Sequence, residues 1–179
     1  MLRALRAPKI AFGDTVELSL RVLPNDLDAN GHMNNARYLA VVDLGLVTLF
    51  ICSGFLRLCL RRGWRPMGGG QLIHYRRGLN VFQRYTLRLA PVGWDEFWNY
   101  VRFDFVRDGE LCATGIMKGA AVGPGGLVPT AEVYPALGHH EPSPTLPPDV
   151  QAWIAADRML GERVKEERNA LLQRASIGS

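Results

Sequence analysis

The side chains best suited to chemistry gather near the start of the chain, in residues 26–38. This segment holds two carboxylates, three amides, an imidazole and an arginine between two apolar stretches. Asp28, Asn30 and His32 alternate along it, and a nearby proline and glycine make a helix unfavourable there. An extended backbone would turn all three side chains toward one cleft. A carboxylate, an amide and an imidazole so placed can bind and activate water.

The same segment leads into an apolar run from Tyr38 to Phe50 that predicts a helix. Asn34 or Asn35 is placed to cap it. The first backbone N–H groups of a helix have no partner within it and attract negative charge. The pattern therefore predicts an oxyanion site for acyl chemistry beside the polar cluster.

The whole block matches the pattern Asp-x-Asp-x-x-Gly-His-x-Asn-Asn-x-x-Tyr, from Asp26 to Tyr38. In this it resembles the hotdog-fold acyl-CoA thioesterases of the 4-hydroxybenzoyl-CoA thioesterase superfamily, and most strongly the branch called thioesterase superfamily member six. Three further segments are similar to that branch: the strand 17–23, the tract 75–77 and the segment 146–154. The resemblance covers roughly residues 15–160.

The resemblance implies a set of roles. The carboxylate of Asp28 is the nucleophile or general base that attacks the thioester, and the amide N–H of Asn35 polarises its carbonyl. Asn30 and His32 complete the expected catalytic set, and Asn34 and Tyr38 are expected beside the substrate. The substrate would be a CoA thioester, with no other cofactor and no metal, and the assembly a homodimer or a dimer of dimers.

Two departures leave alternatives open. The spacing of Asp28, Asn30 and His32 equals that of the catalytic triplet in plant acyl-carrier-protein thioesterases, but those enzymes add a glutamate directly after Tyr-Arg-Arg, where this chain has Gly78. Some bacterial relatives place a catalytic histidine seven residues after the aspartate, where this chain has Asn35. A non-catalytic hotdog protein that binds acyl-CoA or lipid, or acts as a scaffold, is therefore the second hypothesis.

Each polar residue also has a structural interpretation. Asp28 can cap a turn through its side chain, and His32 can hold the loop by bonding a carbonyl. We expect Asp26 to be structural and Arg37 to form a surface ion pair with a carboxylate. Tyr38, one turn into the helix, is expected in the core or the pocket wall rather than as an acid.

Charge is distributed unevenly, although the net charge is only +4. No Asp or Glu occurs from Leu44 to Trp94, and eight arginines fall inside that stretch. Guanidinium groups suit phosphate oxygens, so Arg76, Arg77 and Arg84 are candidates to hold the phosphates of CoA. A general preference for arginine, which supplies 18 of the 21 basic residues, explains the stretch equally well. No aromatic and basic motif indicates nucleic acid.

The chain's 179 residues suffice for one well-buried core. Its three cysteines lack the paired spacing of a zinc or redox motif, which favours buried thiols in a reducing, cytoplasmic compartment. The first twelve residues lack the apolar core of a signal peptide. The uncharged run 44–56 is too short to cross a bilayer, so we expect a buried helix and no integral membrane segment.

These elements predict one α+β domain over 1–179, and the resemblance implies a hotdog core at about 15–122. A strand at 15–23 precedes a long buried helix that reaches Leu60, and Gly54 is placed to bend it. After a glycine hinge at 68–70, strands are predicted at 71–78, 84–90, 96–106 and 111–122, the last two joined by Asp108-Gly109. Seven of the eleven prolines lie in 123–148, which predicts an irregular strap, and a C-terminal helix follows at 149–174.

We therefore expect hydrolysis of a fatty acyl-CoA thioester to free acid and CoA. Hydration of an enoyl-CoA by the same fold requires a proline and one more residue between the aspartate and the histidine, and this chain has neither.

Overall fold

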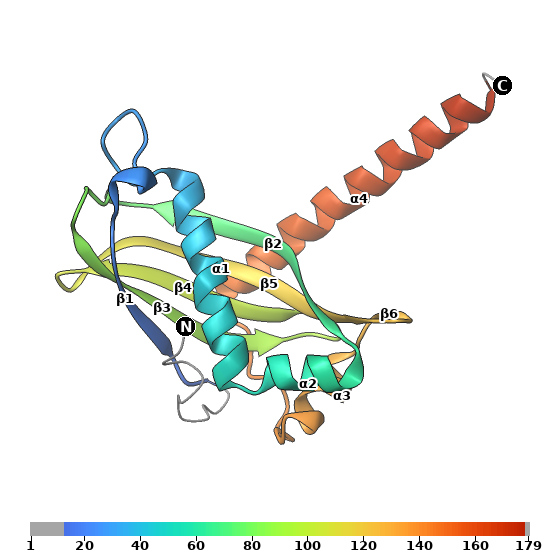
Figure 1. Cartoon of the computed structure of the whole chain (residues 1–179). Helices are drawn as coiled ribbons and strands as arrows, with labels where there is room; N and C mark the ends of the chain where they lie inside the picture. Colours follow the sequence, from blue (N-terminus) through green and yellow to red (C-terminus); the bar gives the residue numbers. More distant parts are fainter. Residues whose placement is uncertain (1–12, 178–179) are drawn as a thin grey trace. The chain divides into compact units, whose positions relative to one another are not determined.

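An antiparallel sheet packs against helix α1 in the structure, a computed structural model that describes residues 13–177 (Figure 1). The six described strands are ordered β1-β3-β4-β5-β2, with β6 beside β5. They are β1 (Val16–Arg21), β2 (Arg65–Tyr75), β3 (Arg84–Trp94), β4 (Asn99–Arg107), β5 (Glu110–Gly123) and β6 (Gly126–Leu127). This confirms the predicted α+β class, with one long helix against a curled antiparallel sheet. The N-terminal segment 1–12, where no signal peptide is predicted, lies outside the described residues.

The predicted long helix is two helices, α1 (Asn35–Cys52) and α2 (Phe55–Arg62). The break lies at Gly54, whose φ of 80° is a left-handed conformation that a side chain would strain. Gly63 ends α2 in the same conformation. The glycine predicted to bend the helix therefore interrupts it.

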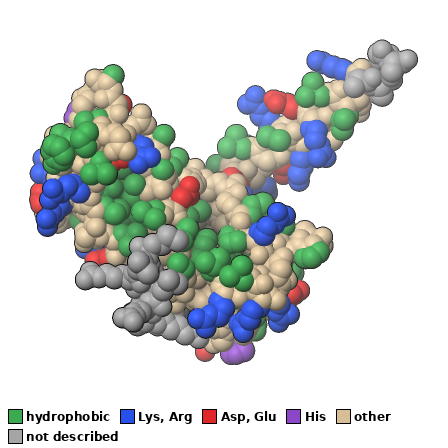
Figure 2. Space-filling view, viewed as in Figure 1, with side chains coloured by type: hydrophobic (Ala, Val, Ile, Leu, Met, Phe, Trp, Pro, Cys, Tyr) green, Lys and Arg blue, Asp and Glu red, His purple; other side chains and the backbone are tan. Residues whose placement is uncertain are grey.

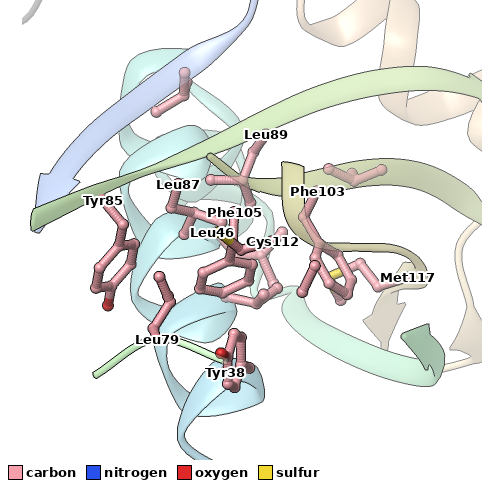
Figure 3. Close-up of a cluster of buried hydrophobic side chains, with 14 of the residues drawn as sticks. Tyr38, Leu46, Leu79, Tyr85, Leu87, Leu89, Phe103, Phe105, Cys112 and Met117 are labelled. Carbon is pink, nitrogen blue, oxygen red and sulfur yellow. The ribbon is translucent and has the colours of Figure 1, made fainter. Parts of the chain in front are cut away.

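Helix α1 packs closely against β3, and a glycine makes this possible. A Cβ at Gly45 would lie within 2.8 Å of the Leu87 side chain and would also collide with Leu89. Around this contact the core gathers aromatic and aliphatic side chains from the helix and the sheet, several of which Figure 3 shows. Among the described helices, α1 alone is long and apolar enough to cross a membrane, but its buried residues face this core.

The predicted strands are present, with one correction. Residues 68–70 are not a hinge but part of β2, where the register against β5 shifts between Gly68 and Gly70. A Cβ at Gly69 would collide with the indole of Trp98, so this glycine is needed for a close approach rather than for a turn. The predicted hairpin at Asp108-Gly109 is confirmed, and both residues have the positive φ that such a turn requires.

The proline-rich segment is more regular than predicted. It contains β6 and a short helix, α3 (Thr130–Ala136), which includes Pro135. The Thr130 hydroxyl lies within hydrogen-bonding distance of the Glu96 carbonyl oxygen, at 3.1 Å, and the Tyr134 hydroxyl donates to Oδ1 of Asn99 at 2.7 Å. These bonds to the sheet hold the helix despite its proline, which the composition alone could not indicate.

The chain divides into two compact units after Thr145. The second unit contains the predicted C-terminal helix, which is α4 (Pro148–Ile177). In the first unit, the three cysteines are free and buried, as predicted. Burial raises the pKa of the Cys59 thiol and, despite nearby arginines, that of Cys112.

Candidate active site

The Asp28 side chain lies in a tight loop that a bridge between Leu27 and Met33 closes. The Asp28 N–H donates to the His32 carbonyl oxygen at 2.9 Å, and the Asn30 N–H donates to Oδ1 of Asp28 at 2.8 Å. The backbone therefore reverses within the loop, and the expected extended alternation of side chains is wrong. The reason is local: an aspartate that accepts the N–H two residues later favours a turn over a strand.

The turn interpretation of Asp28 is thus correct as geometry, and it is compatible with the catalytic role. One carboxylate oxygen accepts the Asn30 N–H. The described residues offer no recorded partner to the other oxygen. Asn30 is exposed within the turn. An aspartate with one oxygen fixed and one available can still orient a water molecule.

A partly buried ion pair joins this loop to α1. Asp26 is 5% exposed, and its Oδ1 lies 2.8 Å from Nε and from Nη2 of Arg37. Its Oδ2 accepts the Leu23 N–H, and its carbonyl oxygen accepts the Asn34 N–H. Asp26 is therefore structural and Arg37 belongs to an ion pair, as expected from the sequence. The pair fixes the loop against the first turn of the helix.

Asn34 caps α1, because its Oδ1 accepts the Ala36 N–H at 2.8 Å. The Arg37 N–H also bonds to Asn34, through the carbonyl oxygen. The N–H of Asn35, the first residue of the helix, has no recorded acceptor among the described residues. The Tyr75 hydroxyl at the end of β2 donates to the Asn35 carbonyl oxygen at 3.2 Å. The predicted oxyanion donor is thus a helix amide without a recorded acceptor. The Asn34 cap precedes it, and the Tyr75 hydroxyl bonds the carbonyl oxygen of the same residue.

His32 lies against the segment that follows β2. Its backbone bridges to Asn80, and the neighbouring Met33 N–H donates to the Leu79 carbonyl oxygen at 2.7 Å. A Cβ at Gly78 would lie 2.8 Å from Cδ2 of His32. Gly78 is the position where the plant enzymes place a glutamate, so that position does border the candidate site. Here the imidazole occupies the space that a side chain at 78 would need.

The three arginines predicted to hold phosphate flank the same segment. Arg76 and Arg77 follow β2, and Arg84 begins β3 opposite Arg21 of β1. Arg77 pairs with Glu110 at 2.7 Å, and Nη1 of Arg76 donates to a carbonyl oxygen at 3.4 Å. All three predicted residues are exposed. The structure therefore brings them to the end of the sheet where α1 begins.

Tyr38 is in the core, and its ring packs edge-on against Tyr75, with ring centroids 5.2 Å apart. It is 2% exposed and packs edge-on against Phe105, with ring centroids 4.8 Å apart. Burial raises its pKa above the usual value, and burial together with the Asp26 carboxylate raises the pKa of nearby Tyr85 to about 12. Tyr38 therefore occupies the core position expected as one of its alternatives, and its place beside the substrate stays a prediction (Figure 3).

A cavity of 600 Å³ lies along the second half of α1, away from the Asp28 loop. Its walls are mainly apolar and come from α1, α2, α3 and four strands; they include Leu46, Phe50, Val101, Met117, Ala120 and Leu137. Sequence analysis did not identify this cavity. No short segment carries its signal, because its lining is assembled from residues 43 to 139.

Among the described residues, Asp43 is the one carboxylate that lines this cavity. It is exposed, and the described residues contain no recorded hydrogen bond or ion pair to it. Eight residues separate it from Asn35, which places it about 12 Å further along the helix. The sequence signal was a single charge in an apolar stretch, at the start of the run 44–56. Within the described chain, no group of three or more His, Cys, Asp or Glu side chains could hold a metal.

Comparisons with known proteins agree with this arrangement. The profile of the thioesterase-like superfamily matches residues 22–154, which contain the loop, α1 and the cavity. Protein THEM6 from Xenopus laevis is 29% identical over 148 residues, which cover 82% of this chain and 70% of that protein.

Solved structures show the same fold. A structure of BH1999 gentisyl-coenzyme A thioesterase superposes with a TM-score of 0.58 at 16% identity, over 64% of this chain and 92% of that one. SAV2348 from Staphylococcus aureus, solved in complex with CoA, gives a TM-score of 0.61 at 14% identity, over 79% of this chain and 94% of that one. The hotdog fold expected from the resemblance is therefore confirmed.

Proposed function

The chain belongs to the thioesterase-like superfamily, and on that premise we propose that it hydrolyses fatty acyl-CoA thioesters to the free acid and CoA. Family membership supports a thioester hydrolase in general. The observation that carries the finer proposal is the free N–H of Asn35 at the start of α1, next to the loop that holds Asp28. A carboxylate and an oxyanion donor at one helix end are the two groups that thioester hydrolysis needs.

The proposed reaction uses Asp28 as the general base. Its carboxylate takes a proton from water while the water oxygen attacks the thioester carbonyl carbon. The carbonyl oxygen becomes an oxyanion, which the Asn35 N–H and the helix dipole stabilise. Collapse of this intermediate breaks the carbon–sulfur bond, and the CoA thiolate leaves and recovers the proton. Direct attack by the carboxylate, followed by hydrolysis of the anhydride, is the nucleophilic version of the same proposal.

The cavity supports a fatty acyl group. A thioester carbonyl held at the helix N-terminus lies about 12 Å from the level of Asp43, where the cavity begins. An acetyl group bound there would stop short of the cavity, whereas a long chain would enter it and bury apolar surface. Gentisyl-CoA, named as the substrate of one similar structure, carries a polar aryl group instead.

The exposed arginines support CoA as the carrier. Arg76, Arg77 and Arg84 are exposed, and a similar structure was solved with CoA bound. Guanidinium groups at an exposed end suit the phosphates of the nucleotide, which must stay near solvent. The free buried thiols support a reducing, cytoplasmic compartment for the reaction.

We also expect a homodimer, because β2 is the last strand of the sheet and offers its free edge to a second copy. Apolar side chains are exposed there and on the neighbouring face of α1: Met67, Leu72, Tyr75, Leu44 and Val47. Figure 2 shows hydrophobic side chains gathered on one face of the first unit. Light scattering should give at least twice the mass of 19.9 kDa, and a monodisperse monomer at micromolar concentration contradicts the expectation.

The alternative is a protein that binds acyl-CoA without hydrolysing it. Gly78 favours it, since this residue, which borders His32, has no side chain where the plant enzymes carry a glutamate. A screen over acetyl to palmitoyl and aryl CoA thioesters, following free thiol, tests the proposal. Release of thiol that rises with chain length supports it. Binding of the same thioesters, measured by calorimetry, without thiol release supports the alternative.

A further inference from the structure

Helix α4 exposes a row of large apolar side chains. Leu160, Val164 and Leu171 are each more than 60% exposed, and Leu172 beside them is 61% exposed. Figure 2 shows hydrophobic side chains between charged ones along this helix. A 30-residue helix with so much exposed apolar surface gains little from packing on its own, which is the usual source of helix stability.

The row has the spacing of a coiled-coil seam. Positions 153, 157, 160, 164, 167, 171 and 174 follow one another by alternating steps of four and three. Apolar residues occupy four of the seven positions, and the remaining three are Asp157, Glu167 and Arg174. Glu167 already bonds Arg163 on its own helix at 3.1 Å. The charged positions therefore decide which partner and which direction the seam accepts.

We propose that α4 pairs antiparallel with α4 of a second copy of this chain. The register that places Leu160 opposite the partner's Leu171 also places Asp157 opposite the partner's Arg174. It sets Val164 against the partner's Glu167, whose carboxylate can turn out toward Arg163. Each of these contacts occurs twice, because the pairing has two-fold symmetry.

The charges disfavour the other arrangements. A parallel pair would place Asp157 opposite its own copy, and likewise Arg174, so that like charges meet in the seam. A membrane surface would require an excess of basic residues on the polar face. Helix α4 instead carries five acidic and five basic side chains. The seam therefore complements itself in the antiparallel direction.

Disulfide trapping on the full-length chain tests the direction and the register. Leu160→Cys and Leu171→Cys are made in two differently tagged copies, mixed and mildly oxidised. The mixed disulfide should form readily, because the two positions face each other. Leu160→Cys alone should cross-link little, since its two copies lie about 16 Å apart along the axis, beyond disulfide reach.

Met159→Cys is the matched control, because Met159 is 70% exposed but lies about 100° around α4 from Leu160, outside the seam. The native thiols are buried and contribute little background. If Leu160→Cys and Leu171→Cys form no more mixed disulfide than Met159→Cys forms with Leu171→Cys, the proposal is overturned. So does stronger cross-linking of Leu160→Cys to itself than to Leu171→Cys, which indicates a parallel pair.

A charge exchange supplies an independent readout. Asp157→Arg and Arg174→Asp should each weaken association roughly tenfold, because each puts like charges together twice. The double variant should restore it, as measured by sedimentation equilibrium, with circular dichroism to confirm that helix content is kept. Single variants that associate like the parent chain, or a double variant as weak as the singles, contradict the antiparallel seam.

Discussion

The two halves of α1 present different environments to a bound thioester. At its N-terminus, a polar loop holds the carboxylate of Asp28 and leads into the first helical amide, which has no recorded acceptor among the described residues. In its second half, the helix borders an apolar cavity with one carboxylate at the edge, Asp43. Each region thus offers one candidate base, and the question is which of them has a partner for the oxyanion.

Helix geometry answers this in favour of the N-terminus. Backbone N–H groups in the middle of a helix are already bonded to carbonyl oxygens four residues earlier, so α1 has no amide to offer beside Asp43. Only its first turn has free amides and the positive end of the dipole. The comparison teaches that the polar end suits the reaction and the apolar half suits the chain of the substrate.

Replacing each of the two carboxylates with an amide in turn gives the largest expected effect. Asp28→Asn should lower the turnover number on the order of a hundredfold or more, because it removes the positioned base but keeps a side-chain oxygen for the Asn30 N–H. Asp43→Asn is the matched control and should change turnover by less than about threefold. Steady-state hydrolysis of a long-chain acyl-CoA measures both. The opposite order of the two losses would move the chemistry to the cavity.

Filling the cavity should give the next largest effect. Ala120 is 3% exposed and lines the cavity, so Ala120→Phe would take up space that a long chain needs. We expect kcat/KM for a long-chain acyl-CoA to fall about tenfold or more, and that for a short-chain acyl-CoA to stay nearly unchanged. Thermal unfolding verifies that the variant is folded. Equal losses for both substrates would show that the cavity does not hold the acyl chain.

Removing one arginine should have a smaller effect, confined to binding. Arg84→Ala should raise KM for acyl-CoA severalfold with little change in kcat, because the phosphates are bound alike in the ground and transition states. Binding should also weaken with salt, since exposed charges are screened. A pantetheine thioester, which lacks the nucleotide, should not respond to the substitution. Equal responses of both substrates would assign Arg84 to the fold instead.

The sequence predicted the polar end of α1 well because its signals are local. The Asn34 cap and the turn at Asp108-Gly109 depend on residues a few positions apart, and the pair of Asp26 with Arg37 spans eleven positions. The cavity depends on residues far apart in the chain, from Asp43 to His139, and no local pattern reports it.

Errors in the prediction have the same origin. The sequence predicts a hinge at Gly69, but in the structure the indole of Trp98 packs against this residue. The sequence predicts an irregular segment around Pro135, but in the structure a hydrogen bond from Tyr134 to Asn99 holds a helix there. In both cases a contact between distant residues overrides the local preference. The reversal at Asp28 differs, since the Asx turn was one of the alternatives that the residue types allowed.

The smallest expected effect concerns His32, and it separates the two roles left open for this residue. The bonds that hold the loop use its backbone: its carbonyl oxygen accepts the Asp28 N–H, and its bridge to Asn80 is also between main chains. His32→Ala keeps these bonds. If the imidazole takes no part in proton transfer, turnover should fall by less than about tenfold, well short of the loss in Asp28→Asn.

Gly78→Ala supplies the control, because the added Cβ would press on Cδ2 of His32 without removing the ring. Equal and large losses in His32→Ala and Asp28→Asn, with a marked loss in Gly78→Ala, would instead assign the imidazole a share of the proton transfer.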